Sequence, residues 1–173
     1  MKKIFAVALV AMMALTANAQ VYVGGSLGYN SSKETSEASS VNTITFAPEI
    51  GYNLSDKWSI GLGINFASRE HNDFTATSMG VDVYGRYNYL TTGIATLFVE
   101  GGVGFTAYNH DGGNTFSIGV RPGISVALSE KLSLVAKTGV LGYSKDSDNA
   151  GGGSSFGIGV DNSDLSLGLF YNF

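Results

Sequence analysis

The chain has no cysteine and only two prolines among its 173 residues. Without cysteine it forms no disulfide and cannot carry a lipid on a cysteine after export, which excludes the lipoprotein class. Beyond residue 15 no apolar run reaches the roughly 18 residues expected of a membrane-spanning helix. Basic residues are also scarce, since ten Lys and Arg stand against 14 Asp and Glu. The resulting net negative charge argues against nucleic acid as a partner.

The amino-terminal segment has the features of a cleavable signal peptide. Lys2 and Lys3 precede an apolar run over residues 4–15, and Ala17 and Ala19 supply the small side chains that a signal peptidase requires. A retained membrane anchor is the alternative, but the run is shorter than the about 20 residues that span a bilayer. The sequence therefore predicts a signal peptide over residues 1–19 and one exported domain over residues 20–173.

Glycine and aromatic residues are abundant, with 24 glycines and 12 % aromatics. In the exported domain apolar side chains alternate with small or polar ones, which is the pattern of β-strands. Eight such segments can be read, within residues 21–29, 44–52, 58–66, 81–89, 97–105, 116–128, 132–140 and 165–173. The last is the most regular and ends on Phe173.

The apolar phase of these eight segments contains no charged residue. A small soluble barrel packs its large apolar side chains inside, whereas a membrane barrel turns them toward lipid and keeps polar groups inside. Gly, Ser, Thr and Asn dominate the other phase, as the narrow interior of an eight-stranded barrel requires. The predicted fold class is all-β, an eight-stranded antiparallel up-and-down transmembrane β-barrel; a soluble barrel is the competing fold.

The connections between segments alternate between short and long. Residues 54–57, 90–93 and 129–130 form the short ones, and residues 31–41, 69–77, 109–113 and 145–163 the longer ones. With an even strand number both ends lie on the periplasmic side, so we expect short periplasmic turns and longer extracellular loops. Pro48 and Pro122 fall inside strands, where proline removes a ladder hydrogen bond, and no inserted residue is evident beside either. Residues 156–160 alternate as well, one register out of phase with the last segment.

These features together resemble the small eight-stranded outer-membrane barrels of Gram-negative bacteria, the OmpX and OmpA transmembrane-domain type. The resemblance covers residues 20–173. It implies residence in the outer membrane, among its lipid and lipopolysaccharide. It also implies that the last strand, which ends on an aromatic residue, is the signal read by the barrel assembly machinery. The residues concerned are Leu165, Leu167, Leu169, Tyr171 and Phe173.

The inward phase carries three acids and three bases, whose charges cancel. They are Glu49, Asp82, Arg86, Glu100, Arg121 and Lys137. Counting from the periplasmic strand ends places five of them in one belt, with Asp82 about one layer higher. Glu100 is expected within reach of both Arg86 and Arg121, and Glu49 is expected to face Lys137 or Arg121. An interior ion-pair network of this kind is either a gate or a structural necessity, and the structural interpretation is favoured because an unpaired buried charge costs about 3–5 kcal/mol.

The loops offer little specific chemistry. Residues 146–151 begin like a calcium loop, but Ala150 and Gly157 occupy its fifth and twelfth positions, so no metal site is predicted. His71 and His110 are the only histidines and lack the surroundings expected of an enzyme acting on lipid A. No phosphate-binding or dinucleotide motif is present, so no cofactor is predicted.

The function predicted is therefore a non-enzymatic outer-membrane barrel with a structural or surface-interaction role, which presents its extracellular loops to a surface or host ligand. Two alternatives remain open. The first is a narrow porin-like channel for ions or small solutes, and the second a membrane enzyme that modifies lipid A.

Overall fold

The computed structural model describes residues 20–32, 41–71, 74–109, 113–138, 140–147, 152–159 and 166–173. The predicted signal peptide over residues 1–19 lies outside this range. Ten strands are present: β1 Val21–Ser32, β2 Val41–Asn53, β3 Trp58–His71, β4 Phe74–Thr92, β5 Ala95–Tyr108, β6 Asn114–Ala127, β7 Leu132–Lys137, β8 Val140–Asp146, β9 Ser154–Gly159 and β10 Ser166–Asn172. Within the described residues no helix is long and apolar enough to cross a membrane.

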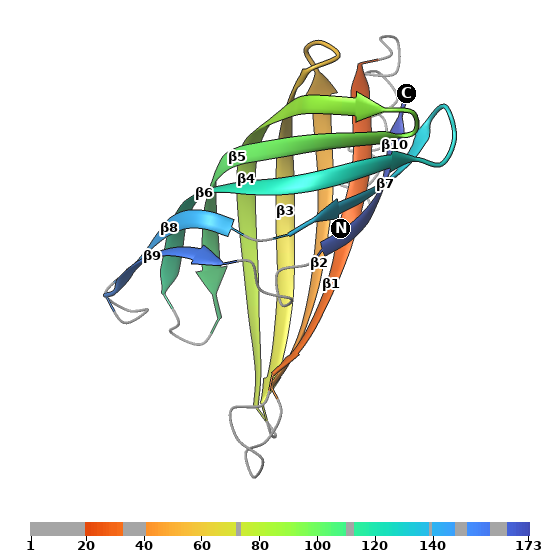
Figure 1. The fold of residues 1–173 in the computed structure, drawn as a ribbon. Coiled ribbons are helices and arrows are strands. Elements are labelled where there is room, and N and C mark those ends of the chain that lie inside the picture. Colours follow the sequence, from red (N-terminus) through yellow and green to blue (C-terminus); the bar gives the residue numbers. More distant parts are fainter. Residues whose placement is uncertain are drawn as a thin grey trace, which may run out of the picture.

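The strands pair antiparallel with their neighbours, and β10 returns to pair with β1, which closes the sheet (Figure 1). The segments β7 and β8 follow one another along β6, and β9 and β10 follow one another along β8 and β7. Each of these two pairs is one wall strand in two pieces. The ten segments therefore form a closed eight-stranded antiparallel barrel, which confirms the predicted fold class.

Side chains alternate between the two faces of the barrel wall, as the period of two predicts. Along β6 exposed and half-buried residues alternate from Asn114 to Ser125. Large apolar side chains on the outer face are exposed in every quarter of the barrel, including Leu27, Leu62, Val83, Ile118 and Leu169. Val21 is an exception, because it is buried although it was expected to face outward. A surface of this composition is unfavourable in water and favourable in hydrocarbon.

Two of the short turns share one sequence and one hydrogen-bond pattern. Leu-Ser-Asp-Lys over residues 54–57 is matched by Leu-Ser-Glu-Lys over residues 128–131. In the first turn the Ser55 hydroxyl accepts from the backbone N–H of Lys57 and of Trp58. In the second turn the Ser129 hydroxyl accepts from the N–H groups of the equivalent two residues. The same serine-capped turn therefore connects β2 to β3 and β6 to β7.

A β-bulge accommodates Pro122, and it lies in the neighbouring strand. Gly123 is opposite Lys137 and Val120 is opposite Leu141. The sequence has two residues between these pairs on the β6 side and three on the other, which is the count of a β-bulge. The N–H of Thr138 donates to the Pro122 carbonyl over 3.2 Å. In an antiparallel ladder the N–H and C=O of one residue face the same neighbour. The N–H that proline lacks would therefore face the bulge and not a regular partner.

The bulge also corrects the predicted phase of this strand. The outward phase was expected to continue through Val140, but Leu141 and Tyr143 of β8 are exposed, as is Lys145, and these lie in the opposite phase. The extra residue of the bulge is the reason, because one inserted residue reverses which side chains point outward in the rest of the strand. Pro48 is accommodated differently. It lies opposite Gly25 of β1, and the pairing of β2 with β3 keeps one register from Phe46 to Glu49.

The predicted long loop at residues 145–163 is shorter than expected. Residues 154–159 form β9, which pairs with β8 from Val140 to Lys145. The alternating run noted in the sequence is therefore a strand of the wall. Whether residues 160–165 join it to β10 falls outside the described residues.

Candidate functional site

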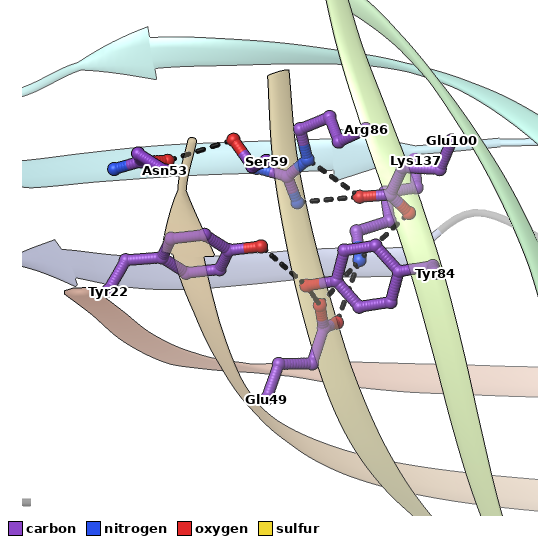
Figure 2. A network of polar contacts seen from close by, with 8 residues as sticks. All are labelled: Tyr22, Glu49, Asn53, Ser59, Tyr84, Arg86, Glu100 and Lys137. Atoms are coloured by element: carbon purple, nitrogen blue, oxygen red, sulfur yellow. Dashed lines mark hydrogen bonds and ion pairs between the residues drawn. The ribbon is translucent and has the colours of Figure 1, made fainter. Parts of the chain in front are cut away.

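Four charged side chains meet inside the barrel (Figure 2). Lys137 Nζ lies 2.7 Å from Glu49 Oε1 and 3.3 Å from Glu100 Oε2. Arg86 Nη2 lies 2.6 Å from Glu100 Oε1, and its Nε donates to the same oxygen over 2.8 Å. The relative exposures are 9 % for Glu49, 8 % for Arg86, 3 % for Glu100 and 5 % for Lys137. The cluster joins β2, β4, β5 and β7, and its two negative and two positive charges cancel.

Two tyrosines extend this network toward the first strand. The Tyr84 hydroxyl donates to Glu49 Oε2 over 2.6 Å, and it lies 3.0 Å from the Tyr22 hydroxyl. With Lys137, Tyr84 therefore satisfies the carboxylate of Glu49 from two directions. A buried polar group that is fully hydrogen-bonded stabilises the interior, whereas a partly satisfied one destabilises it. We call Tyr22, Glu49, Tyr84, Arg86, Glu100 and Lys137 the buried network.

Aromatic rings surround the cations of the buried network. The guanidinium of Arg86 lies 4.4 Å from the centroid of the Phe98 ring and 5.5 Å from that of Phe170. Lys137 Nζ lies 5.2 Å from the Tyr84 centroid. Tyr22, Phe98, Val135 and Phe170 form a buried apolar cluster beside these charges. The rings exclude water and also favour the positive charges through cation–π attraction.

Each of the four interior rings lies against a glycine directly opposite it on the next strand. The pairs are Tyr22 with Gly51, Tyr84 with Gly61, Phe98 with Gly123 and Phe170 with Gly24. A Cβ on any of these glycines would come closer than 3.0 Å to the ring, a separation that real Cβ atoms essentially never show. The glycines therefore create the space in which the rings lie across the lumen.

The structure does not bring all six predicted interior charges together. Glu49, Arg86, Glu100 and Lys137 meet, but Arg121, opposite Glu100 on β6, forms no ion pair with any residue that the structure describes. Lys137 occupies the second oxygen of Glu100, the place where Arg121 was expected. Asp82 accepts a hydrogen bond from the Asn65 side chain, and its carboxylate lies over Gly63.

Two cavities lie on either side of the buried network. The loop-side cavity, of about 450 Å³, is lined by residues including Asn65, Asp82, Ser117, Arg121 and Ser144. The turn-side cavity, of about 340 Å³, is lined by residues including Asn53, Ser59, Arg86, Asn88 and Asn172. No described residue lines both cavities. Along β4, Asp82 lines the loop-side cavity and Asn88 the turn-side cavity, and Tyr84 and Arg86 of the network lie between these two positions.

Sequence reasoning did not single out the interior rings, although a signal was present. Tyr22, Tyr84, Phe98 and Phe170 all occupy the inward phase, and their glycine partners were expected to point inward. The register that sets each ring against one glycine follows only when the strands are paired. Among the described residues no group of three or more His, Asp or Glu could hold a metal ion.

The residues of the predicted assembly signal lie on the outer face where they are described. Leu167, Leu169 and Tyr171 are exposed on β10, and the rings of Tyr171 and Phe173 lie 5.1 Å apart. Leu165, the two histidine rings and the loop acids Glu34, Glu37 and Asp148 lie outside what the structure describes.

Comparison with known proteins gives one family and several similar folds. The family model of the outer membrane protein beta-barrel domain matches residues 4–173. Among solved structures, Neisserial surface protein A is similar with a TM-score of 0.55 at 10 % identity, over 90 % of this chain and 98 % of that one. OmpT of Vibrio cholerae, in its trimer form, gives a TM-score of 0.36 at 13 % identity, over 89 % of this chain and 52 % of that one. No curated protein matches.

Proposed function

The chain belongs to the family of outer membrane protein beta-barrel domains, and we propose that within the outer membrane it is a sealed barrel with a structural or surface-interaction role. One observation carries this proposal: the buried network and its four rings separate the two cavities. A solute passing through the barrel would have to displace ion pairs that are nearly excluded from solvent. Breaking one such pair without replacement costs about 3–5 kcal/mol.

Conductance across a planar lipid bilayer tests the seal. Purified refolded protein is inserted at 1 M salt, with a general porin as the positive control. The expected result is a silent membrane, with insertion checked by protease protection of the barrel in vesicles. Steady openings of the wild-type protein would contradict the proposal and favour a narrow channel.

The channel remains the second candidate because the two cavities enter the barrel from opposite ends. Only the layer of the buried network would have to rearrange. Lys137 already contacts both Glu49 and Glu100, so a change of partner needs little movement of its ammonium group. If the wild-type protein conducts, Glu100→Ala should alter the size or frequency of the openings.

With the seal in place, the parts of the protein open to partners are its outer surface and loops. We propose that the loops contact a surface or host ligand, that lipid and lipopolysaccharide surround the wall, and that the assembly machinery reads the last strand. A binding screen on whole cells tests the first of these, with Glu34, Glu37, Asp146 and Asp148 replaced by Ser in the comparison strain. Equal binding by both strains to every surface tested would contradict a role of these acidic loops.

We further propose that the protein is not an enzyme. Mass spectrometry of lipid A from cells with and without the protein tests this point. An unchanged acyl-chain profile is expected, and loss or gain of an acyl chain would establish the enzymatic alternative.

A further inference from the structure

The loop-side cavity contains two charges that the buried network does not use. Arg121 projects inward from β6, and no carboxylate of the described residues lies within 4.0 Å of its guanidinium. Its cross-strand neighbour Glu100 is already bound by Arg86 and Lys137. Within the described part of the chain, the guanidinium is therefore a positive charge without an ion-pair partner on the wall of a cavity of about 450 Å³, which is within the size range of small-molecule sites.

The other charge of this cavity is a carboxylate held in a fixed position. Asn65 donates to Oδ1 of Asp82, and the carboxylate lies flat over Gly63, directly across the β3–β4 ladder. Asp82 and Arg121 lie on different strands and do not pair with one another. A carboxylate of this kind keeps acceptor capacity for hydroxyl groups of a ligand.

The rest of the wall is formed by small polar side chains, by glycines, and by four larger residues whose side chains are exposed on the outer face: Val81, Val103, Ile118 and Tyr143. Ser117 lies over Gly104, and Ser144 and Ser155 share a hydrogen bond of 2.7 Å. Gly119, Gly142 and Gly157 also line the cavity. Hydroxyls and exposed peptide groups provide donors and acceptors without filling the space.

We propose that the loop-side cavity binds a small polyhydroxylated anion, either a sugar phosphate or a sugar acid. Arg121 holds the phosphate or carboxylate, since a guanidinium matches both groups with two parallel hydrogen bonds. Asp82 accepts hydrogen bonds from sugar hydroxyls, with Asn65 fixing its orientation. Serine hydroxyls complete the polar wall. This inference goes beyond the sealed barrel, and it holds whether or not the protein conducts.

Calorimetric titration of the full barrel in a detergent without a sugar headgroup tests the site. The probes are glucose 6-phosphate, glucuronate, glucose and inorganic phosphate, all at constant ionic strength. Saturable binding of glucose 6-phosphate or glucuronate is expected, about tenfold or more tighter than that of glucose. The relative affinity of these two anions shows whether the site prefers a phosphate or a carboxylate.

Three variants separate the parts of the site. Arg121→Gln should reduce the affinity for the anionic sugar to that of glucose. Lys57→Gln removes one positive charge from an exposed turn and should leave binding unchanged. Asp82→Ala should weaken the binding of the anionic sugar but leave the binding of inorganic phosphate unchanged. Heat-modifiable migration on an unheated gel verifies that each variant is folded.

Three results would overturn the proposal. The first is that neither anionic sugar binds the folded wild-type barrel saturably. The second is that Arg121→Gln binds them as well as the wild type does. The third is that inorganic phosphate binds as tightly as glucose 6-phosphate, which would mean recognition of charge alone.

Discussion

The two halves of the barrel interior are built from the same backbone but are filled differently. Near the short turns, four rings lie on four glycines and four charges form ion pairs with one another. Toward the long loops, the glycines lie opposite Asp82, Thr106 and Ser117, and Arg121 has no described partner. A glycine in the wall thus has opposite effects: opposite a ring it lets the lumen be filled, and opposite a short side chain it leaves a cavity.

The largest effect on stability is expected from a substitution in the buried network, which fills the half of the interior near the short turns. Glu100→Ala removes the carboxylate shared by Arg86 and Lys137, and both cations remain buried. The free energy of unfolding should fall by about 3–5 kcal/mol. Urea unfolding in lipid vesicles, followed by the fluorescence of the single Trp58, measures it. Asp82→Ala in the other half should cost much less, and an equal loss in both would remove the distinction between the halves.

A smaller loss is expected from removing one hydroxyl of the buried network. Tyr84→Phe keeps the ring over Gly61 but removes one of the two donor residues of Glu49, which retains Lys137. A hydrogen bond to a charged group contributes about 1.5–3 kcal/mol, and the stability should fall by that amount in the same assay. Tyr143→Phe, on the outer face, serves as the control and should be neutral. A neutral Tyr84→Phe would mean that the hydroxyl does not stabilise the carboxylate.

The ring-and-glycine packing can be tested with two glycines on adjacent strands. Gly61→Ala places a methyl group against the Tyr84 ring, and overpacking of this kind costs about 1–3 kcal/mol. Gly85→Ala meets nothing within 4 Å and should change stability little. The comparison of the two urea midpoints is decisive, because both substitutions change the strand propensity in the same way. Equal midpoints would contradict close packing of the ring.

The smallest effect on stability is expected in the half of the interior that contains the loop-side cavity. Arg121→Gln removes a half-buried charge that has no described partner, and the unfolding free energy should change by about 0.5 kcal/mol or less. Thermal or urea unfolding measures this directly. A loss comparable to that of Glu100→Ala would show that Arg121 belongs to the buried network after all.

Much of the wall could be predicted from the sequence, because alternation and turn length together determine strand phase. The outward positions of Leu62, Val83 and Ile118 follow from period two alone. The phase beyond Lys137 could not be predicted, because the extra residue of the bulge lies in the partner strand and not beside Pro122 itself. An inserted residue can be recognised only when the pairing of its strand with the neighbouring strand is known, and the alternation of side chains along one strand does not supply that pairing.

The composition of the candidate site was predictable only in part. Counting positions along each strand placed Glu49, Arg86, Glu100 and Lys137 at one level, and they do meet. At that level three basic residues could pair with only two carboxylates. The position of a residue along its strand does not determine which of the three forms an ion pair. Lys137 bridges both carboxylates from β7, whereas Arg121 turns toward the loop-side cavity. The outcome depends on side-chain conformation, which the spacing of residues does not determine.

The pairing of rings with glycines also constrains how this protein can evolve. Tyr22 and Gly51 lie on different strands, yet neither position can accept a larger side chain independently of the other. A lineage that replaces the glycine must first shorten the ring, because the reverse order passes through a clash. The order of substitutions is thus restricted at each of four pairs. In homologous chains, an aromatic residue and its opposite glycine should therefore be gained and lost together.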